Sequence, residues 1–184
     1  MTHGERITSA LALIPQGEFL LTAAKGRRSN GVILDFVGQC ANNPPMLVVA
    51  TAKGQVLTPI IRDSRAFVVS LITDSTRPLA RRFARSNVEA DDPFIGLPTN
   101  TTPRGIPVLA RTVAWFECEL VRHFDIDADC ELYVGNITEV MVTEEAKSEL
   151  EHLVPPTHLM SNPADCLQGE SAMALAQPVL AETR

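Results

Sequence analysis

The sequence predicts a mainly β protein built as an antiparallel barrel or sandwich. Three observations favour this class: the apolar runs are short, turn residues separate them, and they do not alternate with helices as repeated βαβ units require. The 184 residues are 45% hydrophobic and 21% charged, which is ordinary for a globular protein and sufficient for a sizeable core. We therefore expect one principal domain.

Five segments carry the strand signal. In Val113–Arg122 every second residue from Ala114 to Leu120 is apolar, with the glutamates on the opposite side, which is typical of a half-buried strand. Cys130–Val142 continues in the same style, and Gly135 within it indicates a bulge or kink. The other three are short apolar segments typical of buried strands: Glu18–Ala24 and Met46–Ala52, which are bounded by Gly, Pro and Lys, and Ala66–Ile72, which is rich in β-branched residues.

Short helices and one long loop are expected between and around these strands. Pro59 suits a first helical turn, with Thr58 as the N-cap of a helix that ends at Ser64. Six Pro and Gly residues between Asp91 and Pro107 predict an irregular loop. The remaining helices are expected over Pro78–Ser86, near the start over Glu5–Leu13, and in the tail over Ser171–Leu180.

Composition and residue spacing exclude several function classes. The formal net charge of -6 argues against a basic face for nucleic acid, and no apolar run approaches the ~20 residues of a membrane span. The polar N-terminus Met1–Arg6 does not resemble a secretory signal, so we expect a cytoplasmic protein. No CxxC pair or Cys/His cluster is present, so we expect no metal and reduced thiols at Cys40, Cys118, Cys130 and Cys166.

The segment Asn30–Pro45 carries a resemblance to a known family. It reads NGVILDFVGQCANNPP and leads directly into the apolar strand MLVVATA. An Asn-Gly entry, a polar stretch that ends in Pro-Pro and a hydrophobic strand are similar to the flavin reductase-like family. Further matches follow in the family's order: TPIIRDS before AFVVSL, Ala80–Phe83, Gly105–Leu109, Ala114–Cys118 and Asp129–Gly135. The resemblance covers roughly Gly17 to Val142.

The resemblance implies a fold and a function. The fold is a split antiparallel β-barrel of Greek-key type with a few peripheral helices, over residues 1–155, and residues 156–184 form an extension that packs on the domain or its partner. The function is a flavin-dependent oxidoreductase, in which FMN or FAD lies at a homodimer interface and NADH or NADPH is the transient electron donor. The sequence shows no nucleophile–base pair, so we predict no catalytic side chain and assign the hydride chemistry to the flavin.

The family likeness also indicates where the flavin lies. Backbone N–H groups of Gly31–Phe36 would contact the ring or an anion, while Lys53 would supply a charge, and Thr58 a hydroxyl, to the phosphate. Plain structural roles are the alternatives: a turn residue at Asn30, a core aromatic at Phe36, a solvated Lys53 and an N-cap at Thr58. The predicted cofactor-binding residues are Asn30, Gly31, Ile33, Leu34, Asp35, Phe36, Cys40, Ala41, Lys53 and Thr58.

Several positions depart from the family pattern. Ile33, Leu34 and Asp35 replace a Thr-Ala-Ser stretch, Gly38 and Ala41 occupy hydroxyl positions, and Cys130 replaces a His. Losing three or four hydroxyl hydrogen bonds of ~0.5–1.5 kcal/mol each weakens binding by ~10- to 10³-fold or more. A carboxylate about 4 Å from a phosphate charge costs a further ~4 kcal/mol at a dielectric near 20. The alternative function is therefore a split-barrel binding protein that has lost tight flavin binding and catalysis.

Overall fold

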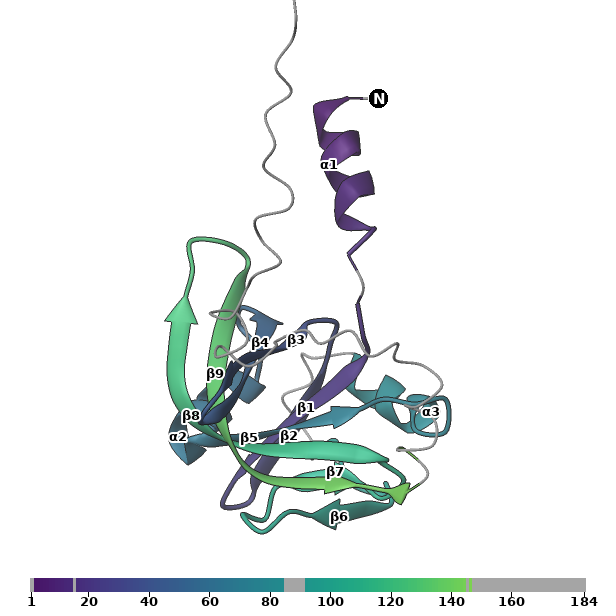
Figure 1. The fold of residues 1–184 in the computed structure, drawn as a ribbon. Coiled ribbons are helices and arrows are strands. Elements are labelled where there is room, and N and C mark those ends of the chain that lie inside the picture. The colour runs from purple at the N-terminus through teal and green to yellow at the C-terminus, as the bar shows by residue number, and fades with distance from the viewer. Residues whose placement is uncertain (1, 15, 85–91, 145, 147–184) are drawn as a thin grey trace, which may run out of the picture. The chain divides into compact units, whose positions relative to one another are not determined.

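A computed structural model of the chain describes residues 2–14, 16–84, 92–144 and 146. Seven strands form one antiparallel sheet: β1 (Phe19–Lys25), β2 (Arg28–Leu34), β3 (Val37–Asn42), β4 (Pro45–Ala52), β5 (Ala66–Leu71), β8 (Ala114–Asp125) and β9 (Cys130–Val142). Their order in the sheet is β2-β1-β5-β8-β9-β4-β3 (Figure 1). A separate pair comprises β6 (Thr99–Thr101) and β7 (Pro107–Leu109). This antiparallel, mainly β architecture confirms the predicted fold class.

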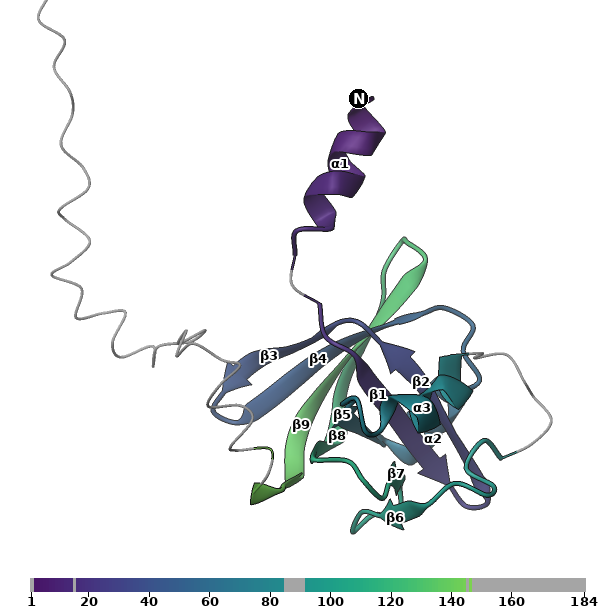
Figure 2. The same ribbon diagram turned by 90° about the vertical axis from the view of Figure 1, so that its right-hand side faces the viewer.

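The sheet does not close into a complete barrel. Its two end strands, β2 and β3, follow one another in the chain and do not pair with each other. β2 pairs with β1 and β3 pairs with β4, and only the bend at Asp35 and Phe36 separates β2 from β3 (Figure 2). The Ala50 N–H donates to the Phe36 carbonyl at 3.5 Å, which joins the bend to β4. Along β2, on the N-terminal side of the bend, no strand pairing joins β2 to β4, so a gap separates these two strands.

The polar segment Asn30–Pro45 is not a loop. Most of it lies in β2 and β3, although Gly and Asn, which recur in it, have low strand propensity. Pairing with the apolar strands β1 and β4 outweighs that propensity, because it buries Val32 and Leu34 in the main core. Tertiary context routinely decides such weak local preferences.

Irregular pairing between β8 and β9 lies beside Gly135, where a bulge or kink is expected. The ladder skips Val121 of β8, directly after the residue that faces Gly135, and also skips Thr138 of β9. Strict alternation places Glu117 opposite the apolar face, yet Glu117 is buried: its carboxylate accepts from the Arg104 N–H at 3.2 Å and pairs with the Arg104 guanidinium. Gly135 also allows close packing, because a Cβ there would lie 2.5 Å from the Phe67 ring.

Four short helical elements complete the described chain: α1 (His3–Leu11), α2 (Leu57–Ser64), α3 (Arg77–Ala80) and the 3₁₀ helix η1 (Arg81–Ala84). A capping box formed by Thr2 and Glu5 starts α1. α2 packs against β1, β2 and β5 and buries Leu57, Ile60 and Ile61. Its N-cap is Val56, so the predicted cap Thr58 lies inside the first turn.

The predicted loop from Asp91 to Pro107 is only partly irregular, because β6 and β7 pair within and just beyond it. Asp91, the predicted tail helix over Ser171–Leu180, Cys166 and the extension 156–184 lie outside the described residues. Among the described residues, no helix has the length and apolar character needed to cross a membrane.

Candidate functional site

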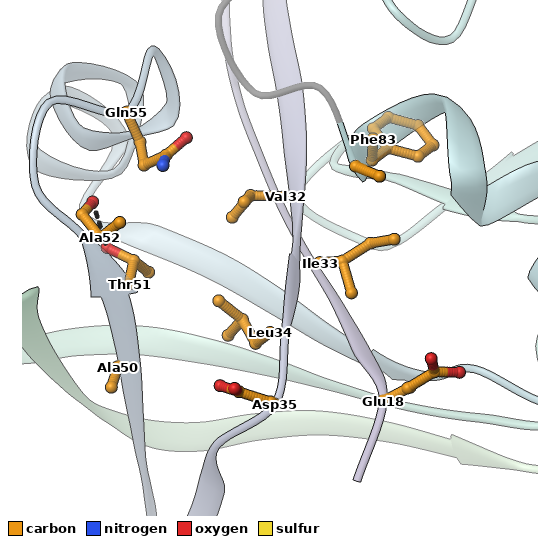
Figure 3. Close-up of a pocket in the computed structure, with 11 residues that line it drawn as sticks. Glu18, Val32, Ile33, Leu34, Asp35, Ala50, Thr51, Ala52, Gln55 and Phe83 are labelled. Carbon is orange, nitrogen blue, oxygen red and sulfur yellow. Dashed lines mark hydrogen bonds between the residues drawn. The ribbon is translucent and has the colours of Figure 1, made fainter. Parts of the chain in front are cut away.

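A cavity of about 410 Å³ lies in the split between β2 and β4 (Figure 3). This volume is within the range of ~300–1,000 Å³ that is usual for small-molecule sites. The cavity is lined by Glu18, Val32, Ile33, Leu34, Asp35, Ala50, Thr51, Ala52, Gln55, Phe83 and Ala84. These residues come from the chain just before β1, from β2, from β4 and the loop after it, and from η1. The split of the barrel therefore forms a site from four separate segments.

The two strands that border the cavity expose unpaired backbone edges. β2 pairs only with β1, and β4 pairs with β3 no further than Val49, so Ala50–Ala52 pair only with β9. In an antiparallel strand, alternate residues direct both N–H and C=O toward the same edge. Backbone donors and acceptors therefore border the gap, and backbone groups of this kind require partners when they are covered. A planar ligand with a polar edge fits this arrangement.

Gln55 adds a polar side chain without a partner. Its Oε1 atom is buried and accepts no hydrogen bond within the described part of the chain. The Gln55 carboxamide points into the gap between the two strands (Figure 3). Because a buried unsatisfied polar atom costs ~1–3 kcal/mol, a ligand that donates a hydrogen bond to Gln55 would relieve that cost.

The charge lining the cavity is negative. The Asp35 carboxylate points across the gap toward β4, whereas the Glu18 carboxylate points away from it (Figure 3). The Arg77 Nε lies 2.7 Å from Glu18 Oε2, and the same guanidinium also pairs with Asp74. No Lys, Arg or His is among the described residues that line the cavity. The cavity therefore suits the uncharged polar part of a ligand better than a phosphate.

The structure places three of the predicted flavin-binding residues, Ile33, Leu34 and Asp35, in the cavity wall. Asn30 and Gly31 lie further along β2 and do not line it. The Asn30 Oδ1 atom accepts a hydrogen bond from the Gly31 N–H at 2.7 Å. Of the predicted residues on β2, those next to the bend line the cavity and those nearer the start of the strand do not.

Three other predicted residues lie on or beyond the bend. Phe36 is 48% exposed and is not the core aromatic that its alternative role requires. Cys40 and Ala41 lie on β3, which pairs with β4 past the split. None of these three residues lines the cavity.

Lys53 and Thr58 make contacts away from the cavity. The Lys53 Nζ lies 2.5 Å from Asp125 Oδ1 and donates to the Ile126 carbonyl at 2.6 Å, so Lys53 is neither a cavity residue nor a freely solvated lysine. The Thr58 hydroxyl donates to Glu131 at 2.5 Å. Both residues connect the segment after β4 to the β8–β9 hairpin, whose tip extends past the neighbouring strands (Figure 1).

The sequence alone did not identify the other lining residues, which include Ala50, Thr51, Ala52, Gln55 and Phe83. One signal pointed to Phe83: the Ala-x-x-Phe pattern that ends at this residue. Its ring lies so close to β2 that a Cβ at Gly31 would be 2.9 Å from it. Small residues and an amide on β4 and its loop carry no comparable signal.

A buried carboxylate lies under α2. Glu131 accepts from the Thr58 hydroxyl and lies 2.7 Å from the Nε2 atom of His123, whose ring stacks on Tyr133 with centroids 4.7 Å apart. Burial raises the pKa of Glu131, but the bonds from Thr58 and His123 outweigh it, so this pKa lies below its ordinary value. Thr51, which lines the cavity, pairs with Glu131 across β4 and β9. The network therefore supports one wall of the cavity.

We expect Glu131→Gln to lower the free energy of unfolding by ~1.5–3 kcal/mol at pH 7, because hydrogen bonds to a charged group are lost. A lowered carboxyl pKa stabilises the fold above the unfolded value near 4.3, and this contribution disappears as pH falls through the folded value. The difference from wild type should therefore shrink between about pH 5 and pH 3. Urea titration across this range measures it, with Glu139→Gln on the exposed part of β9 as control. A difference independent of pH would contradict the assignment.

The described cysteines are free: Cys40 is exposed, Cys118 is buried and Cys130 is intermediate. Burial, followed by the charge of Glu117, raises the pKa of Cys118 to about 12, so its thiol is protonated at neutral pH. Within residues 2–14, 16–84, 92–144 and 146, no group of three or more His, Cys, Asp or Glu side chains is arranged to hold a metal ion.

Comparison with known families agrees with this architecture. The family model of the flavin reductase like domain matches residues 11–160, which is most of the 184-residue chain. The chain belongs to this family. The sequence resemblance on Asn30–Pro45 is thereby confirmed.

Named relatives share the same domain. The chain is 27% identical over 120 residues to diflavin flavoprotein A 1 of Synechocystis sp., which covers 65% of this chain and 21% of that protein. It is 28% identical over 137 residues to the high molecular weight rubredoxin of Moorella thermoacetica, which covers 73% of this chain and 59% of that protein. The chain therefore spans about a fifth of the first relative and three fifths of the second.

Among solved structures, the NADH:FAD oxidoreductase SgcE6 of Streptomyces globisporus has a TM-score of 0.67 to this chain. The sequences are 20% identical, and the match covers 77% of this chain and 84% of that one. At this identity the likeness establishes a common fold.

Proposed function

We propose that this chain is a flavoprotein that binds a flavin in the split between β2 and β4. The observation that carries the proposal is the cavity itself: two unpaired strand edges and the unpartnered Gln55 Oε1 converge on a space of about 410 Å³. The flavin ring is planar, with an apolar end and a polar edge of N–H and C=O groups. The apolar side chains of Val32 and Leu34 suit the apolar end of the ring, and the strand edges and Gln55 suit its polar edge.

In this proposal the protein contributes binding and position. A bound flavin supplies hydride chemistry, with NADH or NADPH as the donor. The backbone of Ala50–Ala52 and Gln55 orient its polar edge, while Phe83 closes the apolar side and limits water. The Thr51 hydroxyl in the cavity wall donates to the Ala52 carbonyl at 3.4 Å, and no bond from it to a basic side chain is present among the described residues, in keeping with cofactor-borne chemistry.

We place the phosphate outside the cavity, because no Lys, Arg or His is among the described residues that line it. The first turn of α2 begins directly after Gln55, and its N-cap Val56 offers no side-chain acceptor. The Thr58 N–H donates to the Gln55 carbonyl at 3.1 Å and Pro59 has no N–H, so the Leu57 N–H is the helix N-terminal donor that we propose for a phosphate. We therefore place the ring in the split and the phosphate toward the start of α2, with FMN preferred to FAD.

Titration of the purified protein with FMN, followed by visible absorption and flavin fluorescence, tests the proposal. Saturable binding with a change in the ring's absorption supports it, and NADH- or NADPH-driven bleaching then tests the oxidoreductase activity. Within the part of the chain that the structure describes, Asp35 has no ion-pair partner and the cavity lining has no Lys, Arg or His; both observations favour a second candidate, a split-barrel protein that no longer binds flavin tightly. No binding at high micromolar FMN would support that second candidate.

We expect the protein to be a homodimer, as the family resemblance implies. Several large apolar side chains of the domain are exposed, including Phe36, Phe124 and Val140. A second copy of the chain is the partner that we propose for such surfaces. Sedimentation at micromolar concentration should give about twice the chain mass of 20.0 kDa. A single species at the monomer mass would contradict this expectation.

A further inference from the structure

We propose that Asp35 makes this site bind oxidised flavin more tightly than reduced flavin. The inference rests on the proposed function and concerns one residue of the cavity wall. It follows from where the Asp35 carboxylate points, from the lack of a counter-charge among the described residues that line the cavity, and from the charge that a flavin ring gains on reduction.

Asp35 lies at the bend between β2 and β3, and its carboxylate points across the gap toward β4 (Figure 3). It lines the same cavity wall as Ile33 and Leu34. No ion pair or hydrogen bond of its side chain is present in the described part of the chain. Glu18, the other carboxylate among the described lining residues, is ion-paired with Arg77 and points away. Asp35 is therefore the carboxylate whose charge acts on a ligand in the split.

The ring, and not the phosphate, is the part of the flavin nearest to Asp35. The strand edges that suit the ring, on Val32–Leu34 and Ala50–Ala52, border the gap that Asp35 faces. A phosphate at this position would lie beside a carboxylate, with no lysine or arginine among the described residues of the lining. The Leu57 N–H that we propose for the phosphate lies past Gln55, in the first turn of α2.

Reduction changes the charge of the ring. An oxidised flavin that gains two electrons and one proton carries one additional negative charge on its ring near neutral pH. A fixed carboxylate beside the ring opposes that charge, which is one of the ways in which proteins tune a flavin. We take about 7 Å between the carboxylate and the ring charge, and an effective dielectric of about 35, between protein surface and bulk water. The repulsion then makes the dissociation constant of reduced FMN roughly tenfold larger relative to that of oxidised FMN.

The experiment measures the dissociation constant of FMN twice for each protein. Oxidised FMN is titrated in air, and FMN reduced with dithionite is titrated without oxygen. The proteins are wild type, Asp35→Asn and the matched control Asp127→Asn, which removes the same charge in the turn of the β8–β9 hairpin, outside the cavity. The ratio of the reduced to the oxidised constant isolates the ring, because repulsion between Asp35 and the phosphate affects both forms equally.

We expect the ratio to fall roughly tenfold in Asp35→Asn and to stay at the wild-type value in Asp127→Asn. A tenfold change corresponds to a rise of about 30 mV in the two-electron midpoint potential of bound FMN, a second readout. An unchanged ratio in an Asp35→Asn protein that binds FMN overturns the inference and leaves the proposed function intact. If none of the three proteins binds either form, the proposed function fails and the inference with it.

Discussion

Ala52→Trp should weaken FMN binding by at least ~100-fold, equivalent to ~2.7 kcal/mol. Ala52 lines the cavity at the end of β4, where a methyl side chain leaves the gap toward β2 open. An indole at this position would occupy the space proposed for the flavin ring. Because Ala52 is exposed, the substitution should not disturb the core, and the melting temperature should change little.

Ala128→Trp provides the matched control for this test. Ala128 is also exposed but lies in the turn between β8 and β9, outside the cavity. FMN titration monitored by flavin fluorescence should give wild-type affinity for this variant. Equal affinities in Ala52→Trp and wild type would show that flavin binds elsewhere on the chain.

Gly135→Ala should destabilise the fold by ~3 kcal/mol or more. The added Cβ would lie 2.5 Å from a Phe67 ring atom and 2.7 Å from the Cys118 Cβ, and both neighbours are fully buried. Inserting a methyl group into a well-packed core typically costs ~1–3 kcal/mol. Here the Cys118 Cβ is attached directly to the backbone, so relief requires the bulged strand β8 to move away from β9.

Gly38→Ala is the matched control, because Gly38 is also a glycine of the same sheet. A Cβ there would make ordinary contacts of 3.6 Å to Val48 and 3.7 Å to Phe36. We expect its free energy of unfolding to change by no more than ~1 kcal/mol, and a gain is allowed because the unfolded chain loses freedom. Urea unfolding of both variants measures the difference, and similar values would refute the packing argument at Gly135.

Several elements follow from local sequence alone. Alternation along Val113–Arg122 and β-branched composition in Ala66–Ile72 predict β8 and β5, since a half-buried or buried strand needs those patterns wherever it lies. The observed β9 has the same bounds as its prediction, Cys130–Val142. The family resemblance on Asn30–Pro45 also brought Ile33, Leu34 and Asp35 to the candidate site before any geometry was known.

Other features depend on contacts between distant parts of the chain. Residues 28–42 form β2 and β3 because β1 and β4 pair with them, and local propensity does not predict that pairing. The burial of Glu117 likewise depends on Arg104 before β7, whose backbone N–H and guanidinium both contact its carboxylate.

The cavity itself is decided only by the tertiary structure. Ala52, Gln55 and Phe83 reach the same space as Asp35 because the sheet curls until β2 and β4 border one gap without pairing. Lys53 and Thr58 have the residue types of a phosphate site, yet the β8–β9 hairpin engages both of them. Residue type limits the chemistry that a side chain can perform, whereas the long-range pairing of strands determines which side chains face a ligand.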